Sequence, residues 1–221
     1  MSQRQTNIFL SGLTVCLVLY LSDQPPGWTD TAHPPAELEH LLPHLRSTLK
    51  MPLSRDIVLQ WQEEGGEPRY FPESRRILFC GDFVRQLEEL LARNRSWLAE
   101  SERLDVRDRF LRFSLLHEVA HVLIGDRNSP PGEDEESAAD GLAVWLALKG
   151  LTDGEAVVAG AVELFSLPGL TPVSTHSSPV ERASRLACLL QGFQGSSTIC
   201  RPAFQELDRL WRGLAASEVQ E

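Results

Sequence analysis

The stretch FSLLHEVAHVLIGD, residues 113–126, carries two histidines four residues apart, with a glutamate directly after the first. On an α-helix, residues four apart leave the same face, so the imidazoles of His117 and His121 can reach one ion. Glu118 lies about 100° further round the helix, beside such an ion without being a ligand. This pattern is typical of a catalytic zinc site, in which Zn²⁺ lowers the pKa of a water and the glutamate accepts the proton.

The alternative is an ordinary buried helix that carries these polar residues by accident. The pattern His-Glu-x-x-His arises by chance in a chain of this length on the order of once in a hundred sequences. The flanking residues are almost all apolar, which places the polar residues at the wall of a core. Burying two imidazoles and a carboxylate there is costly without a cation, so the setting favours a metal site.

A catalytic zinc site needs a third protein ligand, and EESAAD, residues 135–140, supplies candidates one loop further along the chain. Glu136 and Asp140 are four apart and share a helix face. We expect Glu136 to complete the ligand set and Asp140 to accept a hydrogen bond from the outer nitrogen of His117. The competing carboxylates have another interpretation, as a solvated acidic helix start; they are Glu133, Asp134 and Glu135.

His176, in STHSSP, has two interpretations that the sequence leaves open. It reaches into the cleft and stabilises the oxyanion of a tetrahedral intermediate, or it begins a helix that Ser177 and Ser178 cap. The remaining histidines are expected at the surface; they are His33, His40 and His44.

The elements that must position these residues follow from apolar spacing. Residues 56–62 alternate, residues 63–68 have turn chemistry, and residues 69–71 and 75–80 supply further strands, which predicts a small antiparallel sheet. Before it, residues 36–49 have helical spacing broken by Pro43, which predicts two short helical turns.

After the sheet the pattern is helical, and it contains no internal repeat. The economical prediction is one α+β domain over residues 37–215, a short sheet followed by a helical body. The predicted helices cover residues 82–98, 104–124, 136–150, 153–167, 180–190 and 203–214.

The first 22 residues contain an uncharged apolar run, from Ile8 to Leu21, with Arg4 before it. This run has the length of a secretory signal rather than of a membrane span. We expect a signal peptide or an N-terminal membrane anchor over residues 1–22, a Pro-rich tether over 23–36, and an exported or membrane-anchored protein. The alternative is a buried N-terminal element in a cytoplasmic protein.

Charge and cysteine content narrow the function classes. A net charge of −10 and the lack of a basic stripe argue against a nucleic-acid partner. Cys188 and Cys200 flank a Gly/Ser-rich loop, so an oxidising compartment allows a short disulfide there. Buried free thiols are the alternative for these two and Cys80. A thiol enzyme that uses Cys80 lacks a convincing histidine partner.

HEVAH followed by EESAAD resembles the HExxH…ExxAD arrangement of gluzincin metallopeptidases. The short gap between the two motifs is most similar to a bacterial family described only as "putative metallopeptidases". YFPESRRILFC, HSSPVERASRLACLLQG and CRPAFQELDRLW resemble further segments of that family, so the similarity covers roughly residues 55–213. The chain departs from the family in CGDF and in EEGGEP, where a second N-terminal cysteine is missing.

The resemblance implies a zincin-like fold, with His117, His121 and Glu136 as zinc ligands and Glu118 as general base. It also favours a role for His176 and a Cys188–Cys200 bridge. The function expected from these patterns is a zinc-dependent metallopeptidase that acts on a peptide or protein substrate. The alternative is a non-catalytic, zinc-stabilised interaction protein that keeps the peptidase fold.

Overall fold

The computed structural model describes residues 36–49, 56–126, 135–170 and 177–216. These residues all belong to the unit Ala32–Glu221, whereas the unit Met1–Thr31, with the expected export segment, lies outside them. The described residues are mostly helical and include one three-stranded sheet, which confirms the predicted α+β class. No helix among them is both long enough and apolar enough to span a membrane.

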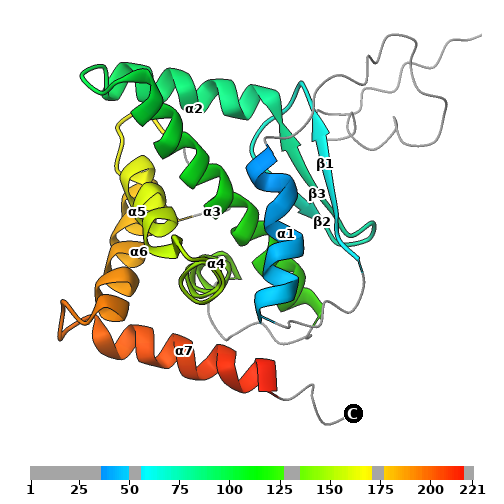
Figure 1. Cartoon of the computed structure of the whole chain (residues 1–221), viewed down its shortest axis with the longest axis vertical. Coiled ribbons are helices and arrows are strands. Elements are labelled where there is room, and N and C mark those ends of the chain that lie inside the picture. Colours follow the sequence, from blue (N-terminus) through cyan, green and yellow to red (C-terminus); the bar gives the residue numbers. More distant parts are fainter. Residues whose placement is uncertain (1–35, 50–55, 127–134, 171–176, 217–221) are drawn as a thin grey trace, which may run out of the picture. The chain divides into compact units, whose positions relative to one another are not determined.

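Figure 1 shows how these elements are arranged around a long central helix. The strands are β1 (Val58–Gln62), β2 (Arg69–Phe71) and β3 (Arg76–Cys80). The helices are α1 (Ala36–Leu49), α2 (Gly81–Asn94), α3 (Glu100–Asp126), α4 (Glu135–Gly150), α5 (Gly154–Phe165), α6 (Pro179–Gln194) and α7 (Arg201–Ala216).

The sheet is mixed, so the prediction of an antiparallel sheet was wrong for one of its two pairings. The strand order is β1-β3-β2, with β3 parallel to β1 and antiparallel to β2. The tight hairpin between β2 and β3 returns the chain into the space between β1 and β2. β3 takes the central position because its side chains Ile77 and Phe79 are fully buried. The strands β1 and β2 each pair along one edge only and are more exposed.

The helix α1 is continuous, so the prediction of two short turns broken by Pro43 was also wrong. A proline inside a helix removes one backbone hydrogen bond and crowds the preceding turn. Here the apolar face of α1 offsets that cost, because Leu38, Leu41 and Leu45 are all buried in the core. Tertiary packing therefore outweighs the local effect of the proline.

The helix α3 positions the candidate site. It packs against α1, α2, α4 and α5 and against β2 and β3, and Figure 1 shows it between the sheet and α5. Its 27 residues extend the predicted range of 104–124 at both ends. Nearly every residue from Leu115 to Ile124 is buried, because the second half of the helix has neighbours all round.

Candidate metal centre

His117 and His121 lie one helical turn apart on α3, and their Nε2 atoms are 3.1 Å from each other. The first turn of α4 brings Glu136 to the same place. Its Oε2 lies 3.2 Å from Nε2 of His117 and 3.6 Å from Nε2 of His121. The ligand atoms of the three residues all lie within 4.8 Å of one another. The structure therefore brings together the three residues expected as ligands.

The outer nitrogens of both imidazoles face carboxylates. Nδ1 of His117 lies 3.0 Å from Oδ1 of Asp140, and Nδ1 of His121 lies 3.0 Å from Oε1 of Glu135. A carboxylate can only accept, so the proton of each neutral imidazole belongs on Nδ1. The lone pairs of both Nε2 atoms then point at each other and at Glu136.

This arrangement fits a divalent cation. With both Nδ1 atoms protonated, two imidazole lone pairs and a carboxylate oxygen converge, which is unfavourable unless a proton or a metal ion lies between them. In a tetrahedral zinc site with bonds near 2.05 Å, neighbouring ligand atoms are about 3.4 Å apart. The separations of 3.1, 3.2 and 3.6 Å bracket that distance. The residues present therefore match the spacing that zinc requires.

The pKa of His117 also indicates that a positive charge is favoured at this cluster. Burial opposes protonation of this imidazole, but the hydrogen bonds to Asp140 and Glu136 outweigh burial and raise its pKa to about 9. The pKa of His121 is raised too, where burial opposes protonation and Glu136 favours it. A proton would therefore compete with a metal ion for this cluster.

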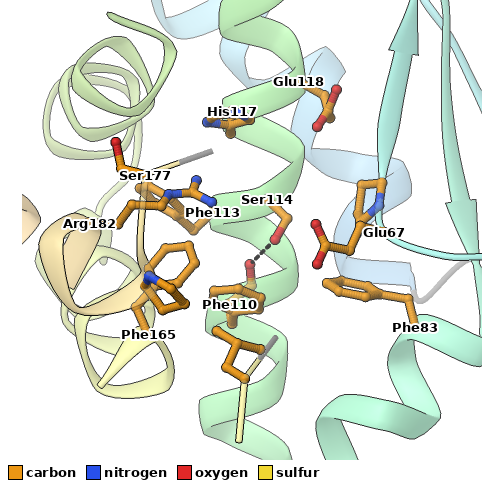
Figure 2. Close-up of a pocket in the computed structure, with 13 residues that line it drawn as sticks. Glu67, Phe83, Phe110, Phe113, Ser114, His117, Glu118, Phe165, Ser177 and Arg182 are labelled. Carbon is orange, nitrogen blue, oxygen red and sulfur yellow. Dashed lines mark hydrogen bonds between the residues drawn. The ribbon is translucent and has the colours of Figure 1, made fainter. Parts of the chain in front are cut away.

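Glu118 extends from α3 on the side opposite to His117, toward the sheet, as Figure 2 shows. The side chain is buried, and its Oε2 accepts a hydrogen bond from the backbone N–H of Tyr70 in β2 at 2.6 Å. Burial raises the pKa of the Glu118 carboxyl, and the nearby imidazoles oppose that rise. The sequence did not reveal the Tyr70 amide, because a backbone group carries no residue-type signal.

Asp140 is buried between His117 and an arginine that sequence reasoning missed. Nε and Nη2 of Arg182, in α6, donate to the two oxygens of Asp140 at 2.9 and 2.6 Å. The guanidinium carbon of Arg182 lies 4.2 Å from the ring centroid of Phe165. Burial opposes ionisation of Asp140, yet His117 and Arg182 hold its pKa well below the usual range. No spacing pattern in the sequence could indicate this contact, because Arg182 is 42 residues from Asp140.

A pocket of about 590 Å³, counted with its open mouth, adjoins His117 and Glu118. Figure 2 shows aromatic rings and Arg182 on one side of it and Glu67 and Phe83 on the other, with Ser114 behind. Its apolar wall consists of Pro68, Phe83, Phe110, Phe113, Phe165, Leu170 and Pro179.

Three of the acidic and histidine candidates lie outside the described residues: Glu133, Asp134 and His176. Ser178 caps α6 in a capping box with Glu181, so a helix does begin at Pro179, directly after STHSS. Glu135 accepts from the outer nitrogen of His121, a role that we did not predict for it. His40 and His44 are exposed, as expected, and His33 lies outside the described residues.

The three cysteines of the described residues divide into a bridge and a buried thiol. Cys188 and Cys200 form a disulfide, so of the two alternatives the bridge is the one observed. Cys80 is free and buried. Burial raises the pKa of its thiol, whereas a nucleophilic cysteine needs a lowered pKa. The arrangement around Cys80 therefore gives no support to a thiol enzyme.

The chain belongs to a family described as "putative metallopeptidase", which it matches over residues 35–197, more than two thirds of its length. This confirms the family suggested by the motifs, and it implies a metal-dependent protease. No curated protein and no solved structure matches the sequence significantly.

Proposed function

We propose that the chain is a zinc-dependent metallopeptidase in which His117, His121 and Glu136 hold the ion. The observation that carries the proposal is the convergence of two imidazole nitrogens and one carboxylate oxygen at 3.1–3.6 Å, with the buried Glu118 next to His117 in the chain. A bound zinc ion would polarise the scissile carbonyl and lower the pKa of a water in the site. Zinc suits two imidazoles and one carboxylate with an open fourth position.

In this proposal Glu118 is the general base. It takes a proton from the attacking water and returns it to the nitrogen of the leaving amine. Its burial and its raised pKa suit both roles, because the carboxylate is a stronger base than in water and holds the proton once it has it. The N–H of Tyr70 orients the carboxylate through Oε2 and leaves Oε1 for the reacting groups.

The pocket beside Glu118 supports a substrate with a large apolar side chain next to the scissile bond. Because Glu118 returns its proton to the leaving amine, a side chain on the amine side of the bond lies nearest to the pocket that Glu118 lines. The aromatic wall of that pocket favours apolar over charged side chains.

Two variants and one metal analysis test the proposal. The wild-type chain is expected to hold one zinc per chain and to cleave members of a peptide library. Glu118→Gln should keep the zinc and lose activity by about a thousandfold or more, since it cannot take a proton. Glu136→Ala should lose both zinc and activity.

The outcomes separate this function from its alternative. A wild-type chain without stoichiometric zinc would contradict the metal site itself. A chain that holds zinc but cleaves no peptide in the library would favour the non-catalytic, zinc-stabilised interaction protein. Glu118→Gln with full activity would contradict the role of general base.

We also propose that the protein is exported or membrane-anchored through residues 1–22. The Cys188–Cys200 disulfide supports this, because such bonds persist mainly in oxidising compartments. Mass spectrometry of the first residue of the native protein, together with fractionation of the cells that make it, tests the proposal. A reduced protein in the cytoplasm would contradict it.

A further inference from the structure

The turn between β2 and β3 holds its backbone in an uncommon conformation at Arg75. Arg75 has φ of +50°, and no other residue except glycine has a positive φ in the described parts of the chain. The N–H of Arg75 donates to the carbonyl of Pro72, and its carbonyl accepts from the N–H of Val58 in β1. An arginine in a conformation that favours glycine or asparagine points to a constraint on its side chain.

The side chain of Arg75 is fixed by Asp126, at the C-terminal end of α3. Nη1 and Nη2 donate to the two carboxylate oxygens at 2.5 and 3.0 Å, and both side chains are less than one-fifth exposed. An acidic residue at a helix C-terminus is unfavourable for the helix dipole. The preferences of a turn and of a helix end therefore explain neither the arginine at position 75 nor the aspartate at position 126. The ion pair between the two side chains explains both.

This ion pair connects the two elements that meet at Glu118. Asp126 and Glu118 lie on one rigid helix, eight residues or about 12 Å apart. Arg75 and Tyr70 lie on one hairpin, in which Tyr70 pairs with Ile77 of β3. β2 has only three residues and lies at the edge of the sheet. Its backbone hydrogen bonds to β3 alone therefore hold it only loosely in place relative to α3.

We propose that Arg75 and Asp126 are positioning residues that clamp the hairpin to α3 and so keep the Tyr70 N–H on the Glu118 carboxylate. The hydrogen bond between Tyr70 and Glu118 is 2.6 Å long and links residues 48 positions apart. A small shift of β2 along α3 would lengthen it. The expected effect on turnover rests on the proposed peptidase function, whereas the clamp itself does not.

The test measures the clamp directly and uses two variants of the full chain. Asp126→Ala removes the acceptor from α3, and Arg75→Asn removes the donor but tolerates positive φ. Asp153→Ala is the matched control, because Asp153 makes an equally two-pronged pair with Arg112 of α3, at 2.6 and 2.8 Å, at the start of α5. Hydrogen exchange of the Tyr70 amide is followed by NMR, and Glu118→Ala gives the rate of the released amide.

In both clamp variants we expect exchange at Tyr70 to accelerate by about tenfold or more, because the bond that protects the amide is loosened. The control should leave it within about twofold of wild type, even though losing an acid from a helix N-terminus is expected to cost more stability. With a cleavable peptide, kcat should fall about tenfold with KM nearly unchanged, because only the base is displaced.

Unchanged exchange at Tyr70 in both clamp variants would overturn the proposal, as would equal acceleration in Asp153→Ala. A fall in kcat of the control as large as that of Asp126→Ala would also overturn it. If the wild-type chain cleaves no peptide, the proposed function fails, and the exchange comparison still decides whether the clamp exists.

Discussion

The two candidate histidine ligands differ in what holds their outer nitrogens. His117 donates to Asp140, whose side chain is 4% exposed and which Arg182 also binds. His121 donates to Glu135, whose side chain is 60% exposed. A buried acceptor in a hydrogen-bonded chain fixes an imidazole more firmly than a solvated one. The two outer carboxylates should therefore contribute unequally to metal binding.

We expect Asp140→Asn to weaken zinc binding by about 10- to 100-fold, the usual range for a lost outer partner of a metal-binding histidine. An asparagine that keeps its bond with Arg182 no longer stabilises the correct tautomer of His117. Competition with a zinc chelator measures the affinity. Glu135→Gln is the control, and its affinity should stay within about threefold of wild type. Equal losses in both variants would contradict the argument.

At the scale of elements, α3 serves the candidate metal cluster and the pocket with successive turns of one face. His117 and His121 form the cluster with Glu136 of α4, whereas Ser114, one turn before His117, lines the pocket only, with its hydroxyl bonded to the carbonyl of Phe110 at 2.9 Å. Because the helix is rigid, a change at Ser114 alters the pocket without moving the candidate metal ligands. Substrate preference and metal binding should therefore be separable by mutation.

Ser114→Leu is expected to reduce cleavage of peptides with a large apolar residue at the amine side of the scissile bond by about tenfold or more. Peptides with a small residue there should be cleaved nearly as before, because leucine occupies only the pocket. The measurement is kcat/KM on matched peptides, with zinc content as a check. Ser184→Leu on α6, where the hydroxyl makes the same kind of bond to Val180 in an exposed position, is the control and should change neither value.

For the whole molecule, the disulfide joins Cys188 of α6 to Cys200, the residue directly before α7, at a sequence separation of 12 residues. We expect Cys188→Ala/Cys200→Ala to lower the free energy of unfolding by about 3 kcal/mol, since the open loop gains entropy in the unfolded chain. Urea denaturation of the zinc-loaded protein measures it. Zinc content should be unchanged, and a reductant should destabilise the wild type but not the double variant.

The sequence predicted best the features that follow from the periodicity of nearby residues. The positions of the helices follow from apolar spacing, and the shared face of His117 and His121 follows from the four-residue step alone. It failed where long-range contacts decide. The parallel pairing of β1 with β3 depends on which strand is buried in the middle, and the continuous helix across Pro43 depends on core packing around it.

By itself the sequence determined the residue types of the site: two imidazoles and a glutamate on one helix, and a carboxylate pair four apart on the next. Only the tertiary structure decided which atoms meet. It placed Glu136 beside the two Nε2 atoms, Arg182 on Asp140, and the Tyr70 amide on Glu118. The reason is physical: helical periodicity acts within a few residues, whereas these partners are 15 to 48 residues apart and meet only when burial packs the elements together.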